Sequence, residues 1–414
     1  MRWNAGAVHA PTSPVTHDAR VREDETGSPA TGEVSLGRIA RTFLRLGAVG
    51  FGGPAAHIAL LQEELVERRR WIDRDRFLEA LGVSSLVPGP TSSELAIHTG
   101  YLLGGQPGAL VAGISFVLPA FVIMTGLSAA YVAAGGFEVR DDLVAGIQPV
   151  VIAVIVAAVW RLRSAVVGWL PGTLAAAVAV LTVALPAWEP IWLLGAGLIA
   201  ALAGTPARRR LAREEPGAVG EVAAGGIAGL VLVSAAGVAV VGAVPALAWV
   251  FLKTGALLFG GGYVLLPLLE PEVLARGWLT RGEFLDGIAL GQATPGPIVT
   301  TSAFVGYVVS GVAGAAVATV AIYLPSFVVV MAGTGPFVRS FRGRPAVRDF
   351  LRGANAAAVG AIAGAGILLG RTALGSPLRI AVGLAATVAL LARVPVWAVL
   401  LAGAAAGLAA GAFA

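Results

Sequence analysis

The sequence contains no cysteine among its 414 residues. This absence excludes disulfide bonds, thiolate metal sites and cysteine nucleophiles. Lysine is nearly absent as well, because Lys253 is the only one, and no Walker-type glycine pattern precedes it. The H-E-x-x-H and G-x-S-x-G patterns of common hydrolases are also missing. An ATP-driven pump, a protease or another membrane enzyme is therefore disfavoured.

Charged residues are scarce too. They make up 13% of the chain, whereas 57% of it is hydrophobic and the mean hydropathy is +0.83; soluble domains carry about a quarter charged residues. The charges lie in short runs between long apolar stretches, which is typical of a multi-pass membrane protein in a lipid bilayer. Nucleic-acid binding is disfavoured because the basic residues form no continuous face.

The polar stretch 1–35 predicts a disordered cytoplasmic tail. Thirteen apolar segments of roughly membrane-spanning length, about 20 residues, follow it. They lie near residues 36–56, 77–103, 107–134, 143–160, 166–186, 188–205, 222–241, 246–269, 284–309, 312–333, 350–370, 378–392 and 395–413.

The chain resembles itself at a spacing of 206 to 208 residues. Residues 43–62 and 251–270 share nine identities, 71–92 and 278–299 share seven, and 100–119 and 306–325 share nine. A register kept over three stretches indicates an internal repeat. The sequence therefore predicts two related sets of six segments joined by one unrepeated helix.

Six crossings followed by a connecting helix would start the second half from the opposite side of the membrane, so we predict inverted repeats. Most arginines fall in loops on the side of the tail, as the positive-inside rule expects. The loop 67–76 is an exception, with five arginines on the predicted outer side. Either the first segment is re-entrant and this loop is cytoplasmic, or the arginines lie outside for a purpose such as attracting anions.

Pro-Gly-Pro occurs twice, at corresponding positions inside apolar segments. Proline removes a backbone donor and clashes with the preceding turn, so each helix should break there. The half-helix after each break presents free N–H groups and a positive dipole end, which suit an anion. A plain proline kink capped by its own hydroxyls is the alternative. The candidate anion-binding residues at the two breaks are Pro88, Gly89, Pro90, Thr91, Ser92, Ser93, Pro295, Gly296, Pro297, Thr300 and Thr301.

A glycine cluster precedes each break, with Gly52 and Gly53 in the first half and Gly260 and Gly261 in the second. Glycine lets the backbone unwind or approach a ligand closely. Close packing of membrane helices by small residues is the alternative explanation.

Four further polar side chains lie in apolar surroundings at aligned positions. Arg45 aligns with Lys253, and such charges at membrane depth are candidates for substrate binding, although long side chains also extend to the interface. Gln148 aligns with Asn355. These amides bind substrate or, as we favour, hydrogen-bond a neighbouring helix.

Three residues of the first half are candidates for proton coupling. Glu94 and His98 are four residues apart and share a helix face, so they could form a proton relay. Thr91 and Glu94 equally match a helix capping box. His57, beside the first glycine cluster, is the third candidate, although a lone histidine is more often structural than a ligand.

These motifs together resemble the chromate ion transporter family in its long two-domain form. The resemblance rests on FGGPAAHI, ERRRWIDRDRFLEAL and VPGPTSSELAIHTGY in the first half, and on LLFGGGYVLLPLLE and GWLTRGEFLDGIALGQATPGPIV in the second. Gly262 and Leu265 stand where Pro54 and His57 are expected, and Thr301 stands opposite Glu94. We therefore expect carboxylate or imidazole proton chemistry in the first half alone.

The resemblance implies a bacterial plasma-membrane carrier that exports chromate. The apolar segments predict an all-α protein, and the repeats with their helix breaks predict alternating access, driven by membrane potential or by protons. A sulfate or other oxyanion carrier is the nearest alternative, and a lipid scramblase or membrane enzyme is the alternative of another class. No cofactor or metal ion is expected, and a homodimer is left open. The expected parts are a tail (1–35), a first repeat (36–205), a basic linker with its connecting helix (206–245) and a second repeat (246–414).

Overall fold

The computed structural model describes residues 34–51, 53–84, 89–135, 141–203, 242–259, 262–333 and 345–412, and no strand occurs in these ranges. The all-α prediction is therefore confirmed for the described residues. The predicted tail up to residue 33 and the stretch 204–241, with the predicted connecting helix, lie outside them. The helices are α1 (Leu36–Val49), α2 (Pro54–Gln62), η1 (Glu63–Arg68), α3 (Arg74–Ser84), α4 (Thr91–Ala133), α5 (Asp141–Leu162), η3 (Arg163–Val166), α6 (Trp169–Ala184), η4 (Pro186–Trp188), α7 (Glu189–Ala203), α10 (Ala243–Ala256), η5 (Gly262–Val264), α11 (Leu265–Ala275), α12 (Arg281–Ala293), η6 (Ile298–Thr300), α13 (Thr301–Gly333), α15 (Pro345–Ala373), α16 (Pro377–Leu391) and α17 (Val396–Ala412).

Helix α4 is a helical hairpin with two arms, 91–103 and 106–133. Gly104 and Gly105 between the arms have non-helical backbone angles. A methyl group added at Gly113 would lie 2.7 Å from Ile97 Cγ1. In one straight helix these two residues would be about 24 Å apart along the axis, at 1.5 Å per residue. The second arm therefore runs back along the first.

Helix α13 repeats this hairpin in the second half, with arms 301–309 and 312–333. Ser310 and Gly311 take up φ/ψ values of −150°/32° and 59°/−151°, nearly those of Gly104 and Gly105, at −155°/28° and 61°/−151°. The positive φ explains the glycine kept at the second position of both turns. The internal repeat seen in the sequence is thus also a structural repeat at these turns.

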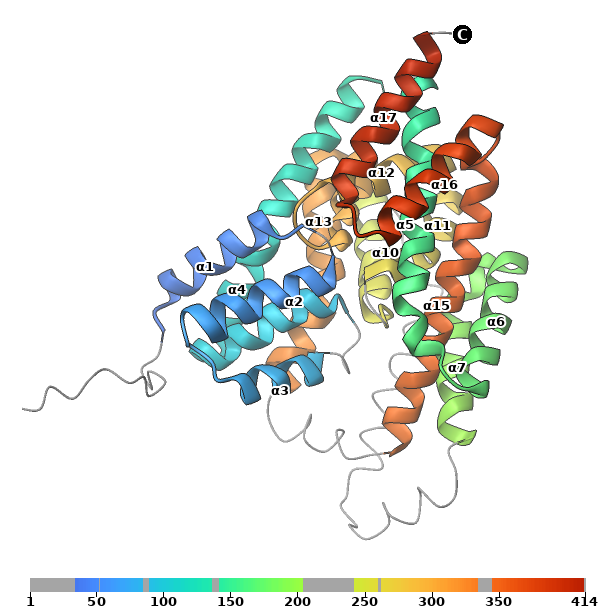
Figure 1. The fold of residues 1–414 in the computed structure, drawn as a ribbon. Coiled ribbons are helices and arrows are strands. Elements are labelled where there is room, and N and C mark those ends of the chain that lie inside the picture. Colours follow the sequence, from blue (N-terminus) through green and yellow to red (C-terminus); the bar gives the residue numbers. More distant parts are fainter. Residues whose placement is uncertain are drawn as a thin grey trace, which may run out of the picture.

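The start of α1, the loop after η1 and the turn of α4 all lie at one end of the first half. The Arg38 guanidinium lies 5.2 Å from the centre of the Trp71 ring. A methyl group at Gly104 would lie 3.7 Å from Leu36 Cδ2. The chain therefore runs inward along α1 and back along α2 and η1, then inward along α3 and back along the first arm of α4 (Figure 1).

The two inward turns reach the middle of the molecule. Gly296 of the second half would place a methyl group 2.6 Å from Ala120 Cβ. Ala120 is 14 residues, about 21 Å, into the second arm of α4. The whole arm is about 41 Å long by the same rise, so the paired helices meet the second half about halfway along it.

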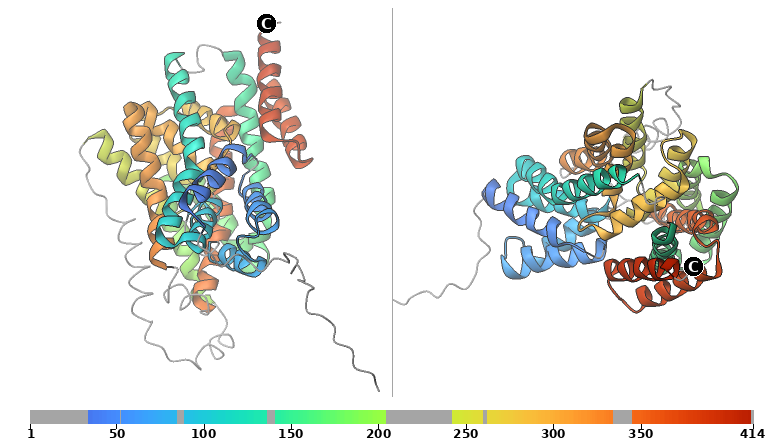
Figure 2. Two further views of the ribbon diagram at one scale, coloured as in Figure 1. Left: turned by 90° about the vertical axis from the view of Figure 1, so that its left-hand side faces the viewer. Right: turned by 90° about the horizontal axis from the view of Figure 1, so that it is seen from above.

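The remaining helices form a bundle in which the two halves exchange partners. α5 of the first half packs mainly on α16 and α17, whereas α15 of the second half packs mainly on α6 and α7. The close contacts correspond, because Gly146 packs on Gly403 and Gly353 packs on Ala196. Gly146 and Gly353 are 207 residues apart in the sequence, and so are Ala196 and Gly403. Such reciprocal contacts are typical of a two-fold relation. Figure 2 shows this bundle beside the paired helices of both halves.

The outer surface is apolar over long stretches. Within the described residues, four helical stretches are long and apolar enough to cross a membrane, including 91–133 and 298–331. Side chains such as Ile114, Val122 and Val320 are more than half exposed. An apolar groove of about 680 Å³ separates the second arms of α4 and α13. This surface suits a lipid environment and supports a multi-pass membrane protein.

Candidate anion site at the helix interruptions

Four interruptions of the helices meet at the centre of the molecule. We call 50–53 and 257–261 the glycine interruptions, and 85–90 and 294–297 the proline interruptions. Gly52, 85–88 (with the predicted Pro88), Gly260 and Gly261 lie outside the described residues. The remaining predicted residues of the interruptions, Gly53, Gly89, Pro90, Pro295, Gly296 and Pro297, are described.

Each proline interruption is hydrogen-bonded to the glycine interruption of the other half. The Gly89 amide donates to the Leu258 carbonyl at 2.9 Å, and the Gly296 amide donates to the Gly50 carbonyl at 2.7 Å. Leu258 is the repeat equivalent of Gly50, so these two bonds are equivalent. The two Pro-Gly-Pro breaks therefore lie in one connected backbone region built from both halves.

His57 links this region to the first half-helix. One of its ring nitrogens, Nε2, donates to the Gly50 carbonyl at 2.9 Å, the same oxygen that accepts from Gly296. Because a carbonyl only accepts, Nε2 carries the proton and Nδ1 accepts from Ser92 Oγ at 3.3 Å in the neutral ring. A methyl group at Gly50 would lie 2.7 Å from Nε2. Any side chain at position 50 would therefore collide with the His57 ring.

Glu94 is fully buried behind the first proline interruption. Its Oε1 accepts from Ser326 Oγ of α13 at 3.1 Å, while Oε2 has no partner among the described residues. The cap of α4 is Pro90, without a side-chain capping bond. The capping box considered for Thr91 and Glu94 is therefore wrong, since the carboxyl group reaches across to the other half instead. His98, one turn further along α4, is buried too.

The hydroxyl groups after the second proline interruption are partly used by their own backbone. Thr300 donates to the Pro297 carbonyl at 2.7 Å, and Thr301 donates to the Ile298 carbonyl at 2.8 Å. Ser302 is fully buried without a hydrogen-bond partner among the described residues. In the first half, Ser93 lies beside the Tyr323 hydroxyl without the geometry of a direct hydrogen bond. Thr91 is half-buried.

The two predicted basic residues form no hydrogen bond or ion pair with the described residues of the interruptions. Arg45 is exposed on α1. Lys253 pairs with Glu272 of α11, which also pairs with Arg276. The corresponding Glu64 is buried and pairs with Arg68 and Arg69. Two arginines of the loop 67–76 thus pair with the same local carboxylate.

The two predicted amides lie in the bundle. Gln148 is buried on α5, with Nε2 3.7 Å from the place of a methyl group at Gly282 of α12. Asn355 is half-buried on α15. The helices that carry them, α5 and α15, are the two equivalent helices that each pack on the opposite half.

Several polar residues near the interruptions were not singled out from the sequence. Tyr263 follows the second glycine interruption, with its hydroxyl 3.9 Å from the place of a methyl group at Gly53 and beside Gln292. Ser326 directly follows the repeated Pro325, which is the signal that could have pointed to it. These residues come from α13 and η5, far in sequence from the groups that they face.

A buried carboxylate also occurs in the second half. Asp286 on α12 is buried and accepts from the Tyr131 hydroxyl at 3.0 Å. Burial of a carboxylate is therefore not confined to the first half, and the expectation of proton chemistry in the first half alone stays a prediction. Asp286 aligns with Glu79, which is exposed. The two acids therefore differ in burial, a property that the alignment of the repeats does not show.

Comparison with known proteins agrees with the geometry. The family model described as chromate transporter matches residues 37–205 and again 245–408. The chromate transport protein of Cupriavidus metallidurans is 33% identical over 360 residues, covering 82% of this chain and 84% of its own length. That of Pseudomonas aeruginosa is 32% identical over 326 residues, covering 73% and 74%.

A shorter relative matches only part of the chain. An uncharacterised transporter of Bacillus subtilis is 27% identical over 154 residues, which is 36% of this chain but 86% of that protein. No solved structure matches the chain. The two matches of one family model and the long relatives show that this chain belongs to the chromate transporter family.

Proposed function

We propose that this protein is a secondary transporter that exports chromate across the bacterial plasma membrane by alternating access. Relatives named chromate transport proteins support the substrate. The reciprocal hydrogen bonds between proline and glycine interruptions carry the mechanistic part of the proposal. They bring two breaks from related halves into one central region, which is the arrangement of substrate sites in many carriers with internal repeats.

The membrane layout that we propose keeps the thirteen apolar segments but makes four of them re-entrant. The segments near 36–56, 77–103, 246–269 and 284–309 enter and return to the same side. Nine segments then cross, if the stretch 222–241 crosses once. Four crossings bring the chain back to the side of the membrane on which the first half begins. The connecting helix then carries the chain across, so the second half begins on the opposite side and the repeats stay inverted.

This layout accounts for the arginine-rich loop 67–76. The contact of Arg38 with Trp71 puts the loop at the same end as the start of α1. With the tail inside, these arginines are cytoplasmic, as the positive-inside rule expects. Of the two explanations for the loop, the structure favours the re-entrant one.

The anion site that we propose lies between the two proline interruptions. The half-helices that begin at Thr91 and Ile298 direct their positive ends there. Ser93 and the buried Ser302 supply hydroxyl donors, and the small Gly89 and Gly296 let the backbone approach an oxyanion. Arg45 and Lys253 would act on the anion through long-range charge, because Arg45 is exposed and Lys253 is paired with Glu272.

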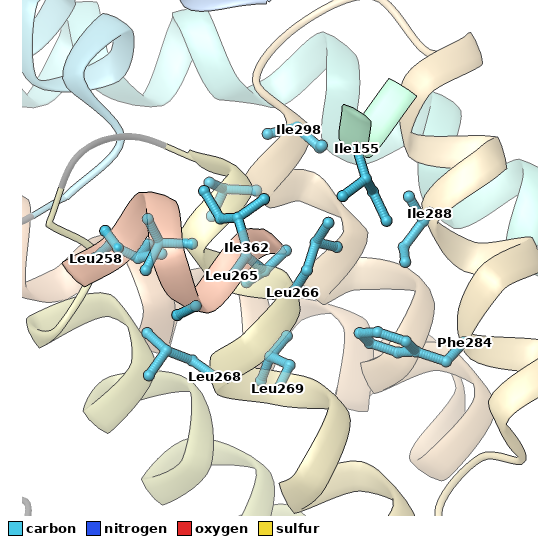
Figure 3. Close-up of a cluster of buried hydrophobic side chains, with 14 of the residues drawn as sticks. Ile155, Leu258, Leu265, Leu266, Leu268, Leu269, Phe284, Ile288, Ile298 and Ile362 are labelled. Carbon is cyan, nitrogen blue, oxygen red and sulfur yellow. The ribbon is translucent and has the colours of Figure 1, made fainter. Parts of the chain in front are cut away.

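Alternating access follows from a difference between the halves. α11 and α12 pack against bundle helices α5, α7, α15 and α17. Figure 3 shows apolar side chains of α11 and α12 in one cluster with Ile155 of α5 and Ile362 of α15. α2 and α3 pack mainly on α1, α4 and η1, and their apolar side chains form a separate cluster. We infer that the paired helices of the first half move relative to the bundle, and that the second half closes the opposite side.

Export of a dianion needs no ATP in this scheme. Moving one charge through 100 mV is worth about 2.3 kcal/mol, so a dianion leaving a negative interior gains about 4.6 kcal/mol. Uptake against the potential would need coupled protons or cations.

Counterflow into proteoliposomes tests the proposal. Vesicles loaded with unlabelled chromate should accumulate labelled chromate only when they contain the protein, and an inside-negative potential should accelerate efflux. No protein-dependent counterflow would reject chromate as substrate. Competition by sulfate, molybdate and phosphate separates a chromate carrier from a general oxyanion carrier, and labelled lipid in the same vesicles tests scramblase activity.

A further inference from the structure

We infer that Glu94 couples a proton to the oxyanion, because its carboxyl group occupies the place at the first proline interruption where the substrate would bind. This inference rests on the proposed function and names a role for one residue of the same site. The carboxyl group comes from the first turn of the half-helix and lies against Gly89, where any added side chain would collide with it and with Ser326.

The position is one that an anion favours. The carboxyl group lies at the N-terminal end of a half-helix, where the dipole and free amides attract negative charge. Ser326 donates to Oε1 from the other half. Oε2 is buried and has no partner among the described residues, so one oxygen of the carboxyl group is not used in a hydrogen bond.

The described surroundings of Glu94 are poor in compensating positive charge. No ion pair involves Glu94 in the described part of the chain. The titratable groups on the elements around it are His57 on α2, His98, Tyr101 and Tyr131 on α4, Tyr307 and Tyr323 on α13, and Arg281, Glu283 and the buried Asp286 on α12. The charged residues of α1 and α3, which also pack on α4, are all exposed: Arg38, Arg41, Arg45, Arg74, Asp75, Arg76 and Glu79.

An ionised Glu94 therefore repels a dianion from the first interruption, and a protonated Glu94 admits it. Like charges in a poorly solvated site cannot both be present without a large penalty. At the second interruption, Thr301 stands in place of Glu94, and Ala120 of the first half stands in place of Ser326, so no such acid is present there. Each dianion then crosses with one proton, and the net charge moved is one instead of two.

The test compares wild type with Glu94→Gln in proteoliposomes at pH 5.5 and pH 8.5. Because chromate itself binds protons near neutral pH, the variants are compared with each other at each pH. We expect similar counterflow at pH 5.5 and at least about tenfold faster counterflow by Glu94→Gln at pH 8.5, since one proton changes occupancy about tenfold per pH unit. Glu63→Gln, an exposed acid on η1, should behave as wild type.

Two further measurements separate coupling from misfolding. The current per labelled chromate should double in Glu94→Gln, and a pH-sensitive dye should report chromate-linked proton movement only for wild type and Glu63→Gln. Ser326→Ala keeps the acid but removes the donor to its ionised form, so its transport should persist to higher pH than that of wild type.

Identical pH profiles and currents for wild type and Glu94→Gln would overturn the inference. If Glu94→Gln is inactive at both pH values, an unshifted profile in Ser326→Ala would overturn it and the alkaline shift would support it. Failure of wild type to exchange chromate would instead reject the substrate, and the same comparison would then be made with sulfate and molybdate.

Discussion

At the scale of single residues, His57 is the side chain that ties both halves together. It holds Ser92 at the start of one half-helix and the Gly50 carbonyl, which also receives the Gly296 amide of the other half. The ring packs edge-on to Phe116 at 5.5 Å. The sequence singled out this histidine, but its contacts with Ser92 and Phe116, and the Gly50 carbonyl that it shares with Gly296 of the opposite repeat, appear only in the structure.

Replacing His57 separates hydrogen bonding from ring packing. His57→Phe keeps an aromatic ring beside Phe116 but leaves the buried Ser92 hydroxyl without its partner. We expect a loss of about 1–3 kcal/mol of stability and a fall of at least about tenfold in chromate counterflow. His57→Gln offers a donor and an acceptor, so it should retain most of the stability and most of the chromate counterflow. Melting temperatures in detergent and counterflow rates check this, and equal losses in both variants would contradict it.

At the scale of helices and their interruptions, small residues decide how closely the elements approach. The arms of each hairpin touch through Gly100 and Gly108 in the first half and through Gly306 and Gly314 in the second. The proline interruptions fit their partners through Gly89 and Gly296. The sequence showed where the helices must break, because proline and glycine act locally. It did not show that each break is held by the other half.

Adding one methyl group tests the fit of the second interruption. Gly296→Ala puts a Cβ 2.6 Å from Ala120 Cβ at a φ of +107°, so both packing and backbone are strained. We expect a loss of about 1–3 kcal/mol and of most chromate counterflow.

Gly126→Ala is the matched control, because it lies on the second arm of α4 with open space around the added atom. It should leave the melting temperature and transport within error of wild type. Equal behaviour of the two variants would show that the interruption is looser than its contacts indicate.

At the scale of the whole molecule, an approximate two-fold relation organises both the interruptions and the bundle. It appears in the paired backbone bonds, in the matching hairpin turns and in the exchanged contacts of α5 and α15. The exceptions to this symmetry are chemical: Glu94 and His57 in one half, and Tyr263 and Asp286 in the other. A transporter with two related halves and one direction of coupling needs such differences.

The natural absence of cysteine makes the proposed layout testable by single-cysteine labelling. Asp73→Cys should react with an impermeant maleimide from the same side of the membrane as Ser35→Cys, because both lie at the end where α1 begins. Gly135→Cys, after the second arm of α4, should react from the opposite side. Labelling of Asp73→Cys together with Gly135→Cys would show that the first segment crosses and would reject the re-entrant layout.

The sequence by itself determined the properties that depend on local chemistry. Apolar runs marked the segments, Pro-Gly-Pro and glycine clusters marked the interruptions, and the regular spacing revealed two related halves. Only the tertiary structure decided that the first two segments turn back, that each proline interruption bonds to the opposite glycine interruption, that Glu94 reaches Ser326 and that Lys253 pairs with Glu272. These are contacts between residues from 19 to 246 positions apart, and hydropathy along the chain contains no information about which distant groups meet.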